Sequence, residues 1–217
     1  MMPSKLVAAV RDLRYLLDRG YPRTSAVRFV ANHYGLGLDE RHLLARCVFS
    51  KGEIEIHRAK AVGMEEVRGK RLGIDGYNVL ITIEGLLSGR KVIRCDDGFL
   101  RDLSAIFGKY RTSGTTRAAL VELLRTVRKA GPGEVALIFD KQVSRSGELS
   151  AMAREEMGRL GLAGDARTAA DVDRRVRGFD VVASSDRAII ERSRAVWDIP
   201  AAVARGRSAA IVDLRKV

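Results

Sequence analysis

The spacing of apolar positions changes near residue 70 and divides the chain into two parts. Over residues 4–49 apolar side chains recur every three or four positions, which is the spacing of helices with one buried face. Gly20 and the segment 35–37 interrupt the pattern, so three short helices are expected. Their expected N-cap residues are Ser4, then Thr24 or Ser25, and then Asp39.

After residue 70 short apolar runs alternate with longer helical patterns. Strands are predicted at residues 71–75, 91–95, 134–140, 180–184 and 209–214. Helices are predicted at residues 78–87, 98–110, 115–130, 146–160 and 186–193. Because strands that alternate with helices form sheets covered on both faces, this part is expected to be a mostly parallel sheet flanked by helices.

The whole chain is therefore predicted to be an α/β protein with a small all-helical N-terminal module. The module covers residues 1–50, a connection covers 51–69, and the α/β domain covers 70–217. The connection is mixed and basic, with a short strand expected at 53–56. Two helices joined by a glycine turn are compatible with a helix-turn-helix, but a plain helical hairpin is the commoner arrangement.

Three strand-like runs end in an aspartate: Asp75, Asp140 and Asp186. Ligands of an open parallel sheet bind outside the carboxyl ends of its strands, so these carboxylates are expected to converge. Clustered carboxylates repel each other unless a cation lies between them, and Mg²⁺ favours carboxylate oxygens. One aspartate at such a position is more often a helix cap or a turn residue. Its repetition in a basic chain favours a divalent-metal site.

A fourth acid is expected from the segment 170–176, which resembles a short helix before the last of these strands. Asp171 and Asp173 would point to opposite sides of that helix, so only one can face the site. Asp173 is preferred and Asp171 is the alternative. Two metal ions could clamp the attacking and leaving oxygens of a phosphodiester, and one ion with a carboxylate base is equally open.

Other polar side chains near these strand ends are candidates for substrate contact. Asn78 could bind a metal-bound water or a phosphate, or could cap a helix, and Ser185 could bind a phosphate or begin a helix. Lys141 and Ser144 lie in a basic, hydroxyl-rich loop of the kind that contacts a substrate backbone.

A second acidic patch, residues 96–102, follows the predicted strand at 91–95. Asp97 could be a further metal ligand and Arg101 a phosphate clamp. The simpler alternative is helix capping together with a surface contact between Arg101 and Asp102.

The amino-acid composition indicates which class of partner the protein binds. The chain has 39 basic and 27 acidic side chains, a net charge of +12, and 30 of the basic residues are arginine. This balance favours a polyanion, and arginine matches phosphate oxygens bidentately, although codon usage in a GC-rich genome explains the arginine excess equally well. The two cysteines and three histidines lack zinc-ligand spacing, and no apolar run reaches membrane-spanning length. A cytoplasmic protein with no membrane contact is expected.

The sequence lacks the motifs of several other functions. It contains no G-x-x-x-x-G-K-[ST] and no G-x-G-x-x-G, so neither nucleotide-binding loop is supported. It also lacks a G-x-S-x-G nucleophile elbow.

The motifs around the aspartates resemble a known superfamily. Residues 74–79, Ile-Asp-Gly-Tyr-Asn-Val, resemble the first strand of the NYN branch of PIN-like nucleases, and segments 170–173 and 182–187 resemble that superfamily's later acidic motifs. The whole chain also looks like an uncharacterised, largely archaeal family that joins a small helical module to a PIN-like domain, through segments 16–22 and 139–141.

The resemblance implies a metal-dependent nuclease, usually acting on RNA. It implies that Mg²⁺ or Mn²⁺ is held by the aspartates Asp75, Asp140, Asp173 and Asp186. The chain departs from the common pattern in two respects: several acids lie between Asp140 and Asp186, and the stretch 97–102 is not part of the usual signature.

The leading hypothesis is therefore a metal-dependent endoribonuclease whose helical module helps to bind the substrate. The alternative is a PIN-like module that binds RNA or a ribonucleoprotein without cutting it, and divalent-metal-dependent cleavage discriminates between the two. A toxin of a toxin–antitoxin pair ranks last, because the chain is long for a minimal toxin. The sequence leaves open a homo-oligomer.

Overall fold

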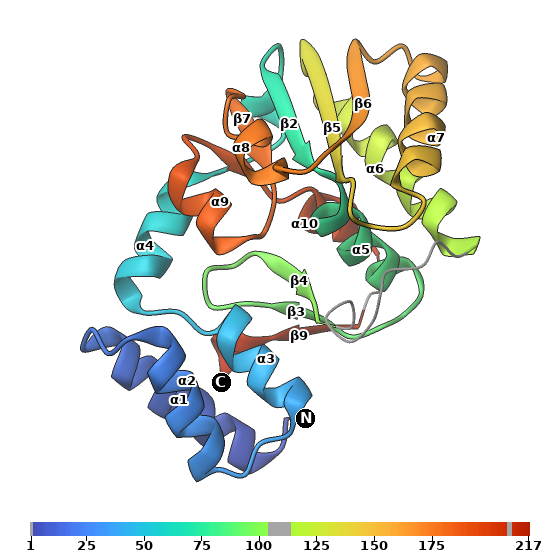
Figure 1. The fold of residues 1–217 in the computed structure, drawn as a ribbon. Helices are drawn as coiled ribbons and strands as arrows, with labels where there is room; N and C mark the ends of the chain where they lie inside the picture. Colours follow the sequence, from blue (N-terminus) through green and yellow to red (C-terminus); the bar gives the residue numbers. More distant parts are fainter. Residues whose placement is uncertain (1, 104–113, 208–209) are drawn as a thin grey trace.

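A six-stranded sheet lies at the centre of the larger part of the molecule (Figure 1). The computed structural model describes residues 2–103, 114–207 and 210–217. The strands, in the order in which they pair, are β1 (Ala61–Val62), β8 (Val196–Trp197), β7 (Val181–Ala183), β2 (Arg71–Asp75), β5 (Glu134–Asp140) and β6 (Gly164–Ala169). Every pair is parallel, so the predicted α/β fold with a mostly parallel sheet is confirmed.

Helices cover both faces of this sheet, which explains why its central strands β2, β5 and β7 are largely buried. One face packs against α5 (Gly76–Leu87), α6 (Gly114–Ala130), α7 (Ser146–Arg159) and α10 (Ile199–Ala204). The other face packs against α8 (Val172–Val176) and α9 (Arg187–Arg192). Along β5 the side chains alternate accordingly, with Leu137 in the first core and Ile138 in the second.

Two glycines allow close packing around β2. A Cβ atom on Gly73 would lie 2.6 Å from the Phe179 ring, and one on Gly76 would lie 2.5 Å from the Phe139 ring. Both distances are below any normal contact, so a larger residue would push α8 or α5 away from the sheet. The two glycines therefore allow α5 and α8 to pack closely beside β2.

The N-terminal part contains the three predicted helices: α1 (Ser4–Asp18), α2 (Arg23–His33) and α3 (Leu38–Cys47). The predicted caps are wrong. The first two helices follow Pro3 and Pro22, whose backbone φ angles of −56° and −57° already suit a helix start. The third follows Gly37, whose N–H group donates to the Glu40 carboxylate. Ser4, Thr24, Ser25 and Asp39 all lie inside the first turns instead.

The predicted strand at 53–56 is also wrong, because residues Lys51–Lys60 form helix α4. Ser50 and Glu53 cap this helix reciprocally: the Glu53 N–H donates to Ser50 Oγ, and the Ser50 N–H donates to the Glu53 carboxylate. The alternation of glutamate and isoleucine imitates a strand, but the satisfied capping box favours a helix.

A second, small sheet lies between the N-terminal helices and the main sheet (Figure 1). It consists of β4 (Leu100–Asp102), β3 (Val92–Arg94) and β9 (Ile211–Asp213) in that order. The strands predicted at 91–95 and 209–214 therefore exist but belong to this sheet. The helix predicted at 98–110 is wrong over residues 100–102, which form β4. Gly98, with a φ of 94°, reverses the chain just before this strand. Residues 104–113 of that prediction lie outside the described residues.

The helical module shares its core with the small sheet. Ile93, Cys95 and Leu214 pack in the same buried cluster as the apolar faces of α1, α2 and α3. Arg14 strengthens this junction, since its guanidinium donates to both oxygens of Asp96 at 3.0 and 2.6 Å and to the Leu214 carbonyl at 2.8 Å. No helix in the described part of the chain is long and apolar enough to cross a membrane.

Candidate carboxylate site and the adjoining cavities

The order of the strands identifies one edge of the main sheet as the expected ligand site. From β2 the chain proceeds to β5 and β6 on one side, and it then returns to β7 and β8 on the other side of β2. The strand order therefore reverses between β2 and β7, and ligands of such sheets bind in the crevice at the carboxyl ends of the two strands. Asp75 ends β2, and the segment 184–186 follows β7.

Asp75 is largely enclosed at this point. Its Oδ2 accepts a hydrogen bond from Ser184 Oγ at 3.0 Å. The pKa of Asp75 is raised to about 7, mainly by burial and also by the charges of Asp173 and Asp186, while hydrogen bonds from the Ser184 hydroxyl and the Asn78 backbone oppose the rise. Asp75, Asp173 and Asp186, called here the carboxylate cluster, thus act on one another, and no positive charge of the protein dominates the pKa of Asp75.

Of the two acids on the segment before β7, Asp173 is the one whose charge acts on Asp75. Asp171 is bonded instead to Arg175, whose Nε lies 3.1 Å from Oδ1, and this hydrogen bond lowers the pKa of Asp171. The short helix predicted there is present as α8, which begins directly after Asp171. The arrangement therefore places Asp173 in the cluster and gives Asp171 a surface ion pair.

The two carboxylate oxygens of Asp186 have different surroundings. Its Oδ1 caps α9, because it accepts from the N–H groups of Ala188 at 2.8 Å and Ile189 at 3.2 Å. Its Oδ2 makes no hydrogen bond within the described residues, so this oxygen is open to a ligand. The helix-capping role and a place in the cluster are thus compatible.

Asp140 lies on the same edge but further along it. The register pairs Asp75 with Ile138, so Asp140 is two residues beyond, roughly 7 Å at the rise of a strand. Its Oδ1 accepts from the Gln142 N–H at 2.8 Å. Burial and then the charge of Asp140 raise the pKa of Tyr77 to about 12. Asp140 is therefore beside Tyr77 at the margin of the cluster.

Asn78 and Ser185 connect the ends of β2 and β7. Asn78 Oδ1 accepts from the Ser185 N–H at 2.8 Å and from Ser185 Oγ at 3.0 Å. Since a backbone N–H can only donate, the Asn78 atom facing it is the oxygen, and the amide nitrogen Nδ2 points elsewhere. Helix α5 begins at Gly76, so Asn78 lies in its first turn and does not cap it.

Asp97 and Arg101 are occupied by each other rather than by a metal ion and a phosphate. The Arg101 guanidinium donates to Asp97 Oδ1 at 2.8 Å and Oδ2 at 2.7 Å, with both side chains buried. His57 Nδ1 lies 2.9 Å from Asp97 Oδ2, which completes a group that we call the ion triad. Burial alone would raise the pKa of Asp97, but the Arg101 charge and the His57 hydrogen bond outweigh it and lower the pKa to about 2.

The expected surface contact between Arg101 and Asp102 is likewise absent from the ion pairs of the described chain, where Asp102 pairs with Arg90 at 3.2 Å. Arg101 instead acts on the site through the backbone, because its Nε donates to the Ser185 carbonyl at 2.8 Å. His57 had no sequence signal beyond being one of three scattered histidines. Its partners come from a different part of the chain, so sequence spacing could not identify it.

The two remaining predicted residues, Lys141 and Ser144, are exposed on the loop between β5 and α7. This loop follows Asp140 directly, so both side chains are accessible to a ligand at that margin of the site. Arg145 next to them has a φ of 62°, the one positive φ among the described non-glycine residues.

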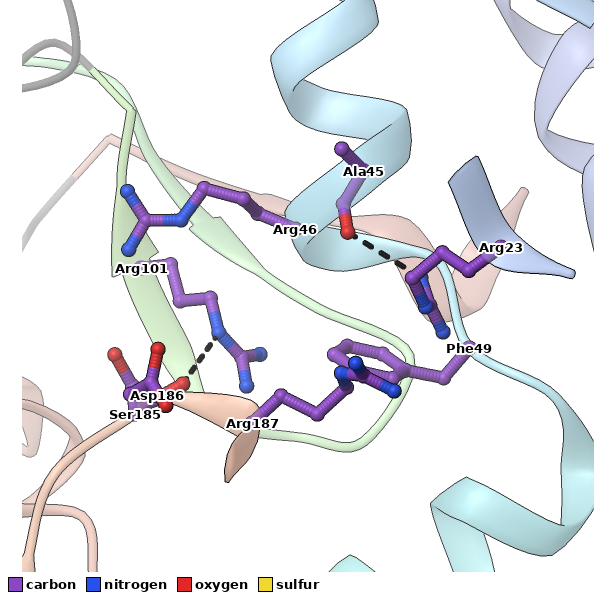
Figure 2. A pocket seen from close by; sticks show the side chains of 8 residues that line it. All are labelled: Arg23, Ala45, Arg46, Phe49, Arg101, Ser185, Asp186 and Arg187. Carbon is purple, nitrogen blue, oxygen red and sulfur yellow. Dashed lines mark hydrogen bonds between the residues drawn. The ribbon is translucent and has the colours of Figure 1, made fainter. Parts of the chain in front are cut away.

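Two cavities of about 210 and 220 Å³ adjoin the carboxylate cluster, and Arg46, Arg101 and Ser185 line both. The first also contains Asp186 and Arg187, and the second contains Asn78. Figure 2 shows the side chains of the first converging from α3, from β4 and from the segment that leads into α9. Sequence reasoning missed Arg46, because an arginine in the last turn of a predicted helix is an ordinary feature.

The fold and the site together define an α/β protein with a cluster of carboxylates at the switch point of a parallel sheet, joined to a helical module. The chain belongs to the family described as "Domain of unknown function (DUF5616)", which matches residues 64–202. Residues 5–60 match a second family, described as "Protein of unknown function (DUF434)". The chain is also 36% identical over 183 residues to "Uncharacterized protein MJ0935" of Methanocaldococcus jannaschii, covering 84% of this chain and 88% of that protein. No solved structure matches it.

The two matched families meet between α4 and the main sheet, at residues 60 and 64. The carboxylate cluster lies within the match over residues 64–202, whereas Arg46 and His57 lie within the match over residues 5–60. Both cavities therefore have walls from both families. Neither description states an activity, so the resemblance to PIN-like nucleases stays a prediction.

Proposed function

We propose that this protein is a divalent-metal-dependent nuclease, an endoribonuclease, that hydrolyses phosphodiester bonds at the carboxylate cluster. The observation that carries the proposal is Asp75. It is an enclosed carboxyl at the switch point of the sheet, and burial with two neighbouring acids raises its pKa to about 7. Acids that repel one another are more often found together at functional sites than elsewhere in a protein. Such sites use carboxyls with a shifted pKa to bind a cation or to transfer a proton.

The donor set fits a hydrated Mg²⁺ or Mn²⁺ ion better than a closed metal cage. Among the described residues, no group of three histidine, cysteine, aspartate or glutamate side chains is arranged to hold a metal ion. Magnesium is usually bound through one or two carboxylates, keeps several waters, and takes substrate phosphate oxygens as further ligands. Asp75, Asp173 and Asp186 would supply those carboxylates, and Asp140 could join from the margin. When bound, the ion would lower the pKa of a coordinated water and stabilise charge on the phosphate.

The side chains around the cluster suit a phosphodiester substrate. Ser184 orients the Asp75 carboxyl through its hydrogen bond to Oδ2, and a carboxyl with a pKa near 7 can accept a proton at neutral pH. The Asn78 amide nitrogen makes no hydrogen bond with a described residue, while its oxygen holds the loop after β7. The net charge of +12 supports a polyanionic partner.

One observation favours a second candidate function. Because the described carboxylates do not form a closed metal set, the same basic surface and crevice would also suit a module that binds RNA without cutting it. The two functions differ in their requirement for a divalent ion. A binder keeps its affinity in EDTA and cuts nothing, whereas the nuclease cuts only with Mg²⁺ or Mn²⁺.

The experiment is a titration of Mn²⁺ with labelled structured RNA against wild type, Asp75→Asn and Asp165→Asn, with cleavage and binding measured in the same samples. Asp165 is an exposed acid on β6, so its variant carries the same charge change away from the site. We expect metal-dependent cleavage by wild type and Asp165→Asn, and a loss of at least about a hundredfold in Asp75→Asn, roughly 2.7 kcal/mol of barrier. Full cleavage by Asp75→Asn would exclude Asp75 from the mechanism. Binding without cleavage at any Mn²⁺ concentration would support the binding module.

A further inference from the structure

Arg46 lies where the helical module meets the α/β domain. It belongs to the last turn of α3, its side chain is partly buried, and it lines both cavities beside the carboxylate cluster. Figure 2 shows its side chain extending from α3 toward the strand that carries Arg101. A cation in this place needs an explanation, because burial without a counter-charge is unfavourable.

The other arginines around the first cavity have acidic partners. Arg23 donates to both oxygens of Glu53 at 2.9 and 2.8 Å, and Arg187 pairs with Glu53 at 3.2 Å. Arg101 is bound bidentately by Asp97. Arg46, by contrast, makes no hydrogen bond or ion pair with any residue that the structure describes. Its guanidinium therefore has five donors without an acceptor in the described part of the protein.

The second cavity places a further donor near Arg46. Both side chains line it, and Asn78 belongs to the α/β domain whereas Arg46 belongs to the helical module. The two hydrogen bonds from Ser185 occupy Asn78 Oδ1, so the amide nitrogen is the group left for a ligand. Asp102 also lines this cavity, but its carboxylate is neutralised by Arg90 at 3.2 Å. The cavity thus combines a cation that no described residue neutralises with a neutral donor, which is the chemistry of an anion site.

We propose that Arg46 binds a phosphate group of the nucleic-acid strand, so that the N-terminal module supplies part of the substrate site. The identity of the anion as a nucleic-acid phosphate rests on the proposed function. Ser185 lines both cavities and adjoins Ser184, which is bonded to Asp75, so the bound phosphate lies directly beside the carboxylate cluster. A strand held there runs between the module and the sheet.

The test compares full-length wild type with Arg46→Gln, Arg46→Lys and Arg11→Gln. Arg11 is exposed on α1 of the same module, so its variant removes the same charge away from both cavities. Two probes are used in EDTA: single-stranded RNA at several salt concentrations, and inorganic phosphate followed by the thermal unfolding midpoint. Because the shared core ties the module to the small sheet, the full chain is used rather than a truncated one.

In Arg46→Gln we expect RNA affinity to fall roughly tenfold or more, which is the effect of losing one charge-assisted contact. The slope of log affinity against log salt should fall by about 0.7, the value for one phosphate on a single strand. Arg46→Lys should lie between, since it keeps the charge but loses the bidentate fork. Arg11→Gln should follow wild type, and inorganic phosphate should raise the unfolding midpoint of wild type but not of Arg46→Gln.

The outcomes separate this inference from the proposed function. If wild type binds RNA and Arg46→Gln binds it as Arg11→Gln does, the anion site is overturned and the nuclease proposal stands. If RNA does not bind but phosphate stabilises wild type through Arg46, the anion site stands and the nucleic-acid function falls. If wild type binds neither probe, both are overturned.

Discussion

Asp97 and Asp75 are both enclosed aspartates beside the same loop, yet their surroundings affect them in opposite ways. Asp97 is bound by Arg101 and His57, and its pKa falls to about 2. Asp75 has a serine hydroxyl and two further acids as neighbours, and burial together with those acids raises its pKa to about 7. The protein provides its own cations for the first carboxylate and none that dominates the second. Asp97 is therefore neutralised within the protein and has a structural role, whereas Asp75 requires a ligand from outside the protein.

The two groups also connect different elements. The ion triad joins α4, in the connection between the module and the α/β domain, to the turn before β4, and through Arg101 to the Ser185 carbonyl. The carboxylate cluster joins the ends of β2 and β7 with α8. Ser185 adjoins both groups, because its N–H is bonded to Asn78 while its carbonyl is bonded to Arg101. The triad can therefore position the loop at which the proposed chemistry occurs without taking part in it.

The largest effect is expected for the stability of Asp97→Asn. Removing the charge leaves Arg101 buried without its counter-ion, which typically costs about 3–5 kcal/mol of unfolding free energy. Asp75→Asn should keep or increase the unfolding free energy, because it removes a carboxyl that burial and two acids already disfavour in its charged form. Urea unfolding of both variants and wild type at pH 7.5 measures the contrast.

Equal losses of stability in the two variants would break the comparison, because both carboxylates would then be structural. A stable Asp97→Asn protein would show that the triad is not needed for folding. Circular dichroism of each variant in the absence of urea serves as the control for a folded starting state.

A smaller effect is expected in acid, and its sign follows from Asp97. The folded-state pKa of about 2 lies below the ordinary value of 3.8, so ionised Asp97 stabilises the fold above about pH 4. This contribution, about 2 kcal/mol, is lost as the pH falls through 2. The difference in unfolding free energy between wild type and Asp97→Asn should therefore shrink between pH 5 and pH 2. A difference that stays constant over that window would mean that the Asp97 pKa is not lowered.

The smallest effects should discriminate Asp171 from Asp173. Asp173→Asn removes a member of the cluster, so Mn²⁺-dependent cleavage should fall roughly tenfold, as when a group that tunes a metal site is lost. Asp171→Asn removes an exposed pair with Arg175, and neither cleavage nor the unfolding midpoint should change measurably. Cleavage rates of the two variants at saturating Mn²⁺ make the comparison, and the reverse order of effects would exchange their roles.

The sequence was sufficient to predict three strands of the main sheet, β2, β5 and β7, together with their carboxyl ends. Short apolar runs such as 71–75 and 134–140 favour strands buried on both faces, and an aspartate that ends such a run is expected at the sheet edge. That logic located Asp75, Asp140 and the segment 184–186. The short strands β1 and β8 and the mostly exposed β6 lack such a run, so they could not be predicted.

The junction of module and domain could not be predicted, for a different reason. Its contacts join residues that are far apart in the sequence, such as His57 with Asp97 and Arg14 with Asp96. The sequence predicted a helix at 98–110, whereas the hairpin around Gly98 places Arg101 against Asp97 in a buried site. Arg46 becomes noticeable only in the folded chain, where it lines both cavities and pairs with no described residue.

The shared core of the helical module has a consequence for synthesis. Leu214 is buried against helices that begin at residue 4, and Arg14 is bonded to the Leu214 carbonyl. At a translation rate of roughly 5–20 residues per second, the first helices wait on the order of ten seconds or more for that leucine. During that interval their apolar face has no complete cover, so the ribosome-bound chain should depend on chaperones until β9 arrives.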